Sequence, residues 1–450
     1  MILDHEYTGR NSNQGKCMSK KVVTSRTGRF MKLAGMTASV AGRYASDKVH
    51  SVFASQEKVV LRKKDSYTKM AGDIADTLGE LKGAVMKIGQ IASQTQDFLP
   101  KEFSDALQKL QKDAPPVEFE TIKNQVETQL KGEIATLYKS FDIEPYASAS
   151  IGQVHRAVLH DGTEVVVKVQ YPGVEESCDS DLKQLKLTLK LGGLLKMPKS
   201  SVDALFLEIK ERLHEELDYV NEAKNLVNFR EFHKDQPKII VPKVVDELST
   251  RKVLTLVFED GDHAAELESA GYEQDVIDDI GHGLFDMLAR QLFVFNQIHG
   301  DPHPGNFAFR KDGSVVIYDF GCVKMLKPEI VEAYRDAINS SLKEDYQSLD
   351  SAMLKLGARV RSKPTPGKEY YAVWRDIFFE PFLSSDKYDF GKADLHTKAA
   401  KQTPLFFKHI EYFKPPVDSL YIDRMIGGQY WIMKNLGVKA DFSPMLSEFL

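Results

Sequence analysis

The stretch HGDPHPGNFAFRKDGSVVIYDFG, His299 to Gly321, carries the strongest information about the fold of this chain. It places three polar side chains, Asp301, Asn306 and Asp319, among prolines, glycines and an apolar run. Asp301 and Asn306 are five positions apart, and Asp319 follows thirteen positions later, directly after the letters VVIY. Carboxylate and amide oxygens hold the divalent metal in phosphoryl-transfer sites. The spacing therefore predicts Asn306 and Asp319 as metal ligands, with Asp301 beside them.

Phosphoryl transfer needs positioning and charge more than covalent help from the protein. In protein kinases a strand lysine contacts the phosphates, an H-R-D-x-x-x-x-N loop supplies the catalytic aspartate and one metal ligand, and D-F-G supplies another. Asp301 and Asn306 have this offset, and Lys168 ends the run EVVVK, which matches V-A-I-K. A turn or a solvated strand end is the simpler interpretation of each motif alone. All three in kinase order indicate a kinase-like nucleotide site.

Length and composition set the broad class. The chain has 450 residues, 42% of them hydrophobic, and a formal net charge of −5. This length fits two domains or one two-lobed enzyme, and the negative charge argues against a nucleic-acid partner. The three cysteines, Cys17, Cys178 and Cys322, predict neither a disulfide nor a metal site and fit a reducing compartment. No run approaches the roughly 18 apolar residues of a membrane span.

The N-terminal region is strongly basic. From Tyr7 to Ser46 there is no acidic residue, and eight lysines and arginines occur. We expect residues 1–26 to form a disordered arm, and a basic helix from Thr27 to Ser46 to contact a membrane peripherally from the cytoplasmic side. The alternatives are that this helix packs on its own protein or on a second copy in a homodimer. Asp4 and Glu6 count against an organelle transit peptide.

Hydrophobic periodicity divides the rest of the chain. It predicts helices at 27–46, 65–95, 101–112, 119–139, 179–196 and 202–232. It predicts strands at 145–149, 152–159, 163–170, 238–245 and 252–259, with Asp161-Gly162 as a hairpin turn. The expected fold class is α+β, a kinase-like two-lobed fold with a helical extension. The expected domains are the extension at 27–140, an antiparallel-sheet N-lobe at 141–262 and a helical C-lobe at 263–450.

Two features differ from ordinary protein kinases. The glycine-rich loop is absent, and ASASIGQVHRA stands at 147–157 in its place. Alanine and serine allow fewer backbone conformations than glycine, so we expect a stiffer loop over the phosphates. After Gly321 the chain enters a helix, Pro328 to Leu342, without a segment ending in A-P-E. This leaves no long platform for docking a peptide.

Six motifs give the chain a family resemblance, MKIGQIASQTQDFLPKEF, ASASIGQVHRA, VVVKVQYPGV, ELDYVNEAKN, HGDPHPGNF and YDFGC. Together they resemble the UbiB/AarF atypical kinase-like family from about Ser25 to the C-terminus. The resemblance implies a kinase-like fold whose N-terminal extension covers the active cleft. It also implies Mg²⁺-dependent binding of ATP or ADP, ATPase activity, and a partner among isoprenoid lipids or quinone precursors, in ubiquinone or related metabolism.

The resemblance also assigns residues in the extension. Lys87 and Gln90 form the K-x-G-Q signature, three positions apart and so on one helix face. The family places this face over the cleft, where we expect both residues to act in catalysis. Glu216 and Asp218 match the E-x-D motif and are expected near Lys87. Without the resemblance, a solvated lysine, a surface amide and an exposed acidic helix face are the simpler interpretations.

The resemblance also implies which residues contact the nucleotide. Glu222 matches the helix-C glutamate that pairs with Lys168, although it follows 54 positions later because a helix is inserted. The implied nucleotide-contacting set is Lys168, Glu222, Ala147, Ser148, Ala149 and Ser150. Family members commonly have alanine at the position of Ser148, which leaves nucleotide preference open. The expected activity is an ATP-dependent phosphotransferase or ATPase, the alternatives being a conventional protein kinase and a nucleotide-binding pseudokinase scaffold.

Overall fold

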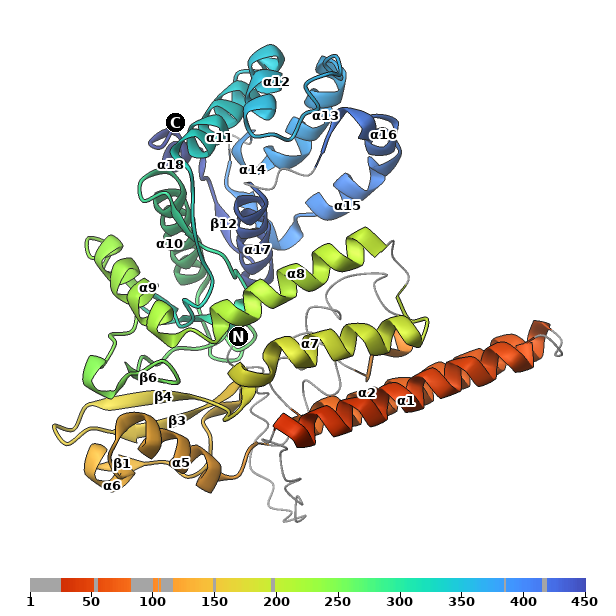
Figure 1. Cartoon of the computed structure of the whole chain (residues 1–450). Helices are drawn as coiled ribbons and strands as arrows, with labels where there is room; N and C mark the ends of the chain where they lie inside the picture. Colours follow the sequence, from red (N-terminus) through yellow and green to blue (C-terminus); the bar gives the residue numbers. More distant parts are fainter. Residues whose placement is uncertain are drawn as a thin grey trace. The chain divides into compact units, whose positions relative to one another are not determined.

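The computed structural model describes most of the chain as two units. The described residues are 26–51, 56–81, 100–103, 105–106, 116–148, 151–195, 199–383, 386–414 and 419–450. The N-terminal unit contains those up to Lys224 together with Lys243–Phe258, and the C-terminal unit contains Asn225–Pro242 and Glu259–Leu450 (Figure 1). The sequence predicts a boundary between the two lobes at residue 262. In the structure, Asn225–Pro242, which precedes this boundary, belongs to the C-terminal unit, and that unit resumes at Glu259.

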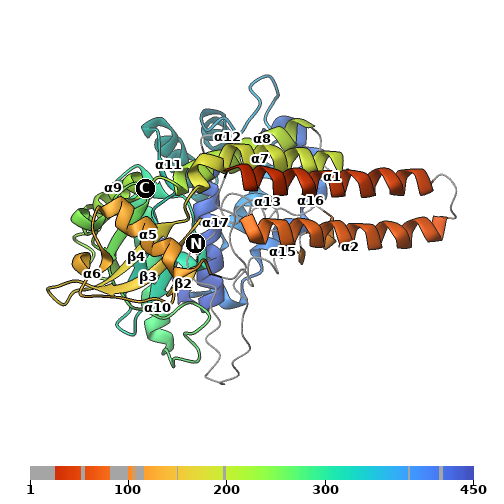
Figure 2. The same ribbon diagram turned by 60° about the horizontal axis from the view of Figure 1, so that its bottom comes forward.

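Helices lie both before and after the first strands of the N-terminal unit. They are α1 (Arg26–Ser51), α2 (Gln56–Leu81), α5 (Phe119–Leu130), α6 (Ile134–Leu137), α7 (Val174–Leu191), α8 (Lys199–Glu216) and the start of α9 (Tyr219–Phe232). Helices α1 and α2 lie side by side, and α1 also packs along α7 (Figure 2). The apolar residues Leu33, Met36 and Val40 of α1 are buried at steps of three and four. The predicted 202–232 helix is two helices, α8 and α9.

A five-stranded antiparallel sheet completes this unit. Its strands are β1 (Ser140–Phe141), β2 (Ala147–Ser148), β3 (Gly152–Val158), β4 (Glu164–Gln170) and β6 (Val253–Val257). The order is β1-β3-β4-β6, with β2 also paired to β3. The predicted Asp161-Gly162 turn joins β3 to β4, and Gly162 has φ 91°, which only glycine adopts readily. Lys168 on β4 lies between Val154 of β3 and Leu254 of β6.

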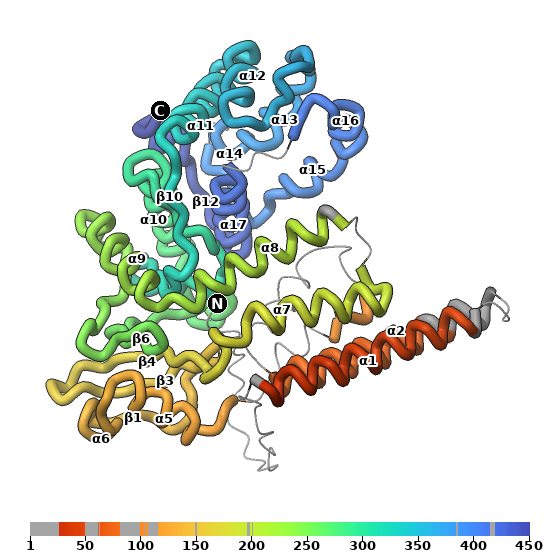
Figure 3. Tube along the Cα trace, in the orientation of Figure 1, coloured from red at the N-terminus to blue at the C-terminus, as the bar shows by residue number. Residues whose placement is uncertain are grey.

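The C-terminal unit is mostly helical. Its main helices are α10 (Gln274–Phe293), α11 (Pro328–Leu342), α12 (Tyr346–Lys355), α13 (Lys368–Phe378), α14 (Glu380–Leu383), α15 (Leu395–Lys401), α16 (Thr403–Lys408), α17 (Leu420–Leu436) and α18 (Ser443–Ser447) (Figure 3). Helix α11 begins and ends where the sequence predicts. The short strands are β5 (Ile239–Ile240), β7 (Gln297–His299), β8 (Phe307–Phe309), β9 (Val315–Ile317), β10 (Val323–Met325), β11 (Tyr388–Asp389) and β12 (Lys439–Ala440).

One predicted strand forms only in part and joins a different sheet. The run 238–245 does not add a strand to the five-stranded sheet. Its first half, β5, pairs in parallel with β9 in the C-terminal unit, in the order β5-β9-β8. Its second half makes only an isolated bridge, Val244 to Leu256, beside β6. Pro242 separates the halves, and because proline has no N–H it cannot continue a ladder of strand hydrogen bonds.

The basic helix α1 packs on its own protein, which is the alternative to membrane contact. Arg29, which lies in the helix expected to contact a membrane, is 2% exposed, and its Nε donates to Asp181 of α7 at 2.9 Å. Lys32 pairs with Glu80, and Arg43 with Asp73. Arg29 is therefore not available to a membrane surface, and acidic residues match the charges of Lys32 and Arg43, while membrane contact by the rest of this helix stays a prediction. Among the described residues, we find no helix with the length and hydrophobicity needed to cross a bilayer.

Candidate functional site

The central contact of the N-terminal unit is an ion pair between Lys168 and Glu222. The Lys168 Nζ lies 2.8 Å from Glu222 Oε1 and 3.0 Å from Oε2. The lysine side chain is 9% exposed and the glutamate 1%. The ammonium also lies 5.1 Å from the centre of the Tyr219 ring, within cation–π range. The predicted ion pair is present and almost completely shielded from water.

Helix α9 presents Glu222 to the lysine. The carboxylate of Asp218 accepts a hydrogen bond from the Asn221 N–H at 3.1 Å, which satisfies one of the open donors at the helix start. Its backbone carbonyl accepts from the Glu222 N–H at 3.0 Å. Asp218 is therefore a helix cap one turn from the ion pair, and Glu216 is the last residue of α8. The E-x-D motif lies at the junction of the two helices.

The alanine–serine loop is partly described. Ala147 and Ser148 form β2 and pair with Val154 and Gln153 of β3. A Cβ atom at Gly152 would lie 2.3 Å from the backbone oxygen of Val169, so only glycine fits where β3 crosses the end of β4. Four predicted site residues, Lys87, Gln90, Ala149 and Ser150, lie outside the described residues.

In the C-terminal unit a hairpin brings Asn306 and Asp319 to one end. Asn306 directly precedes β8, Asp319 closely follows β9, and these strands pair antiparallel with Phe307 opposite Ile317. The Tyr318 N–H donates to the Asn306 backbone oxygen at 3.0 Å, which closes that end of the hairpin. The Asp319 carboxylate accepts from the Gly321 N–H at 2.9 Å. The predicted amide and carboxylate therefore leave the same end of a hairpin.

Asp301 and Asn306 are joined directly. The Asn306 side-chain nitrogen donates to the backbone oxygen of Asp301 at 3.0 Å and to its Oδ2 at 3.1 Å. Asn306 is fully buried. Because an amide nitrogen does not bind a cation, this orientation leaves the amide oxygen Oδ1 as the Asn306 atom that could hold one. The five-residue offset thus produces one polar loop.

A buried histidine holds the D-F-G segment. The His299 Nε2 is hydrogen-bonded to the Asp319 backbone oxygen, and the His299 N–H donates to Gln291 Oε1 at 3.0 Å. Burial lowers the pKa of His299 below 6.5, so the ring is neutral near pH 7 and its Nε2–H is the donor. The Phe320 ring is fully buried between His299 and Phe229, with centroid distances of 5.2 Å and 4.9 Å.

The structure adds one residue that the sequence did not indicate. Arg424 of α17 places Nη2 3.6 Å from Asp301 Oδ1. Its Nη1 is buried and has no hydrogen-bond partner among the described residues. A Cβ at Gly428 would lie 2.2 Å from Pro302 Cγ, so the helix lies directly against the loop that carries Asp301. The arginine supplies a positive charge at the predicted catalytic carboxylate.

Comparison with known proteins identifies the relatives. Residues 109–353, more than half of the chain, match the ABC1 atypical kinase-like domain. The chain belongs to the ABC1 (UbiB/COQ8) atypical kinase-like family. This confirms the family resemblance and the kinase-like α+β fold class predicted from the motifs.

Two relatives and one solved structure illustrate the match. The Dictyostelium discoideum protein named probable serine/threonine-protein kinase abkA is 28% identical over 100% of this chain and 84% of its own length. The Caenorhabditis elegans protein named atypical kinase coq-8, mitochondrial, is 27% identical over 95% of this chain and 57% of its own length. Rv3197 from Mycobacterium tuberculosis, solved with erythromycin, matches with TM-score 0.58 and 28% identity, covering 88% of this chain and 98% of that one. The chain covers less than two thirds of the length of some relatives, such as the 57% given for coq-8.

Proposed function

We propose that this family member is a Mg²⁺-dependent enzyme that binds ATP and either hydrolyses it or transfers its terminal phosphoryl group. The observation that carries the proposal is the buried Lys168–Glu222 pair. Removing two charges from water costs several kcal/mol per ion, so such a pair is weak evidence for stability and better evidence for a retained function. In kinase-like sites this pair orients the lysine toward the nucleotide phosphates.

The residues of the C-terminal unit fit a magnesium ion and a phosphate. Mg²⁺ prefers oxygen ligands and is commonly bound through one or two side chains plus phosphate oxygens. The Asp319 carboxylate and the Asn306 amide oxygen supply that donor set from one end of the hairpin. The buried Nη1 of Arg424, without a partner among the described residues, is a donor suited to a phosphate oxygen. The C-terminal unit therefore offers oxygen ligands for a magnesium ion and a nitrogen donor for a phosphate.

Each residue then has a defined role in our proposal. Lys168 holds phosphate oxygens, and Glu222 keeps the ammonium directed and charged. Asp319 and Asn306 hold the Mg²⁺ ion, which neutralises phosphate charge when bound. Asp301 accepts the proton of the attacking water or hydroxyl, and Arg424 orients its carboxylate through the 3.6 Å contact.

We also propose the acceptor class and location. An isoprenoid lipid or quinone precursor is favoured as acceptor or effector by the family membership. The absence of an A-P-E segment after Gly321 disfavours a peptide. We also propose a cytoplasmic location, peripheral contact with a membrane, and formation of a homodimer. Because Lys32 and Arg43 of α1 already pair with acidic residues, this helix has less positive charge to offer an anionic membrane and is a weaker candidate for the membrane anchor.

The test is hydrolysis of ATP by the purified chain with Mg²⁺, with and without isoprenoid-lipid vesicles. We expect turnover in the unmodified protein, loss in Asp301→Asn and Lys168→Met, and retention in Lys252→Met. Lys252 is a matched control in the same unit, where it pairs with Glu176 at 2.7 Å. Binding of ATP without any turnover would replace the enzyme by a nucleotide-binding scaffold. Robust phosphorylation of peptides would favour a conventional protein kinase.

A further inference from the structure

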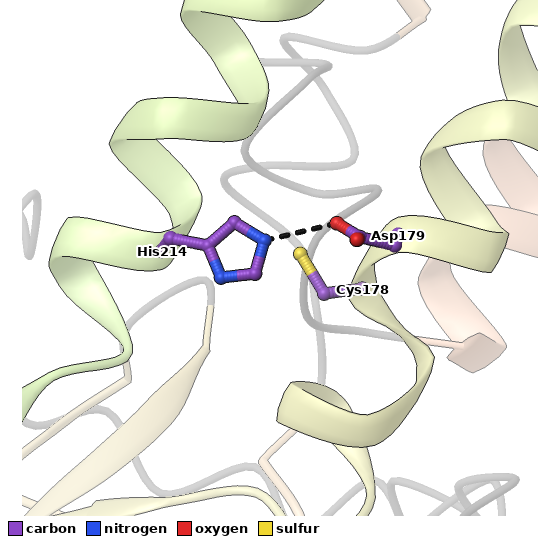
Figure 4. A group of neighbouring side chains, drawn as sticks. All are labelled: Cys178, Asp179 and His214. Carbon is purple, nitrogen blue, oxygen red and sulfur yellow. Dashed lines mark hydrogen bonds and ion pairs between the residues drawn. The ribbon is translucent and has the colours of Figure 1, made fainter.

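Helices α7 and α8 bring together a thiol, a carboxylate and an imidazole. The side chains are Cys178 and Asp179 of α7 and His214 of α8 (Figure 4). One ligand atom from each lies within 4.8 Å of the other two. Within the described ranges, no other group of three histidine, cysteine, aspartate or glutamate residues meets this condition. The cysteine spacing alone gave no indication of it.

The two oxygens of Asp179 have separate partners. His214 Nε2 lies 2.9 Å from Oδ1, and Lys210 Nζ lies 2.8 Å from Oδ2. Figure 4 shows the Cys178 sulfur directed toward the space between the imidazole and the carboxylate. An ion that takes Oδ1, Nε2 and Sγ can therefore leave the Lys210 contact at Oδ2 in place. Such an outer contact fixes the orientation of a metal-binding carboxylate.

We propose that Cys178, Asp179 and His214 form a binding site for a thiolate-preferring divalent transition-metal ion, with Zn²⁺ as the best-matched ion. Zn²⁺ takes cysteine sulfur, histidine nitrogen and aspartate oxygen at about 2.0–2.3 Å, usually in a tetrahedron. Three protein ligands leave the fourth position for water. Mg²⁺ selects oxygen ligands, so this site differs in chemistry from the Asn306 and Asp319 pair.

Small side-chain movements complete the coordination. At those bond lengths the ligand atoms of a tetrahedral ion are about 3.5 Å apart. The imidazole and carboxylate must separate slightly from 2.9 Å, and the sulfur must approach from within 4.8 Å. The His214 side chain is 49% exposed and can rotate without disturbing the core. An ion therefore has access from the solvent side.

Binding exchanges a proton for the metal. Burial is the main reason that the pKa of Cys178 is raised, to about 12, so the thiol keeps its proton in the absence of metal. Metal coordination breaks the S–H bond of Cys178 and releases one H⁺ to solvent. The neutral His214 ring must also exchange its proton from Nε2, where it faces Asp179, to Nδ1 through solvent, which leaves the Nε2 lone pair for the metal. The charged groups around the sulfur are Asp179, Asp181, Lys210 and Arg29. Affinity should therefore fall in acid.

The consequence for the fold is a link between two helices. Cys178 and Asp179 lie near the start of α7, and His214 lies in the last turn of α8. A bound ion would join these ends and restrain the junction that carries Glu216 and Asp218. This inference does not depend on nucleotide binding, because no residue of the cluster belongs to the proposed nucleotide or magnesium set.

The test is titration of the full chain with Co²⁺, in excess Mg²⁺ to occupy oxygen sites. Co²⁺ bound to a thiolate gives a charge-transfer absorption band, which oxygen ligands alone do not give. We expect a band that saturates at one Co²⁺ per chain, release of a proton, and loss of the band on adding Zn²⁺. Zn²⁺ should also raise the Tm of the unmodified protein.

Variants locate the site. Cys178→Ser should abolish the band, and His214→Gln, on the exposed side, should weaken it strongly without affecting folding. Cys17→Ser and Cys322→Ser are the matched controls and should keep it. The proposal fails if the unmodified chain gives no band, if Cys178→Ser retains it, or if His214→Gln leaves the titration unchanged. The cluster would then be a salt bridge beside a buried thiol.

Discussion

The burial of the Lys168–Glu222 pair makes a quantitative prediction. Lys168→Met removes the ammonium and leaves the Glu222 carboxylate, 1% exposed, without its cation. Exposed ion pairs contribute about 0–1 kcal/mol, but stranding one partner of a buried pair costs about 3–5 kcal/mol. The low exposure of both side chains places this pair in the second class. We therefore expect the N-terminal unit to lose about 3–5 kcal/mol of stability.

The assay must report on the unit that contains the pair. The chain has two tryptophans, Trp374 and Trp431, and both lie in the C-terminal unit, so fluorescence does not follow this change. Amide hydrogen exchange in β3 and β4 does follow it. A loss of about 3–5 kcal/mol speeds exchange through global opening of the unit about 10²- to 10⁴-fold, since 1.4 kcal/mol is tenfold.

The matched control is an exposed ion pair in the same sheet, with the same nitrogen–oxygen distance. Arg156 Nη2 lies 2.8 Å from Glu164 Oε2, with exposures of 39% and 61%. Glu164→Gln should change exchange less than about fivefold, in line with about 0–1 kcal/mol for exposed pairs. The double variant Lys168→Met with Glu222→Met should be more stable than Lys168→Met alone. Equal small effects at both pairs would show that burial of the Lys168–Glu222 pair does not set its contribution to stability.

Three further predictions concern the site. Since the pKa of His299 is lowered by burial, protons bind the unfolded chain preferentially, so the C-terminal unit should lose stability as pH falls below 6.5. Its tryptophan-detected urea midpoint should show this loss, less so in His299→Gln; a pH-independent midpoint contradicts it. Arg424→Met should lower kcat/KM for ATP about 10- to 100-fold, because it removes the charged hydrogen bond proposed from Nη1 to a phosphate oxygen, and an unchanged value would remove Arg424 from the site. Lys87→Ala should permit self-phosphorylation from radiolabelled ATP, and Lys87→Ala with Asp319→Asn should not; label in the double variant would show that Asp319 is not needed.

Local signals in the sequence predicted elements but not their partners. The Asp161-Gly162 turn and helix α11 formed where predicted, because a turn dipeptide and helix ends are set by neighbouring residues. The run 238–245 is apolar enough for a strand, but strand propensity does not specify which strand it joins. Its halves contact β9 and β6, and only the tertiary fold decides this.

The site residues, too, were predicted where the signal is local in the sequence and missed where it depends on the fold. Asp301 and Asn306 were found because their spacing is short and local. Glu222 was found through the family motif, since nothing in a chain-wide pattern pairs it with a lysine 54 positions earlier. Arg424 was missed because α17 meets the catalytic loop only in the folded chain. The Cys178 cluster was missed for a related reason: its third member, His214, comes from a different helix.

In the proposed function, Asp319 binds the metal ion that accompanies the nucleotide. The most direct measurement is calorimetric titration of ATP into the unmodified chain and Asp319→Asn, each with Mg²⁺ and with EDTA. We expect Asp319→Asn to weaken ATP binding in Mg²⁺ at least tenfold, or about 1.4 kcal/mol, and to change metal-free binding little. Asn306→Ala should show a smaller defect in the same direction. Equal affinity of Asp319→Asn and the unmodified chain in Mg²⁺ would show that Asp319 does not hold the metal.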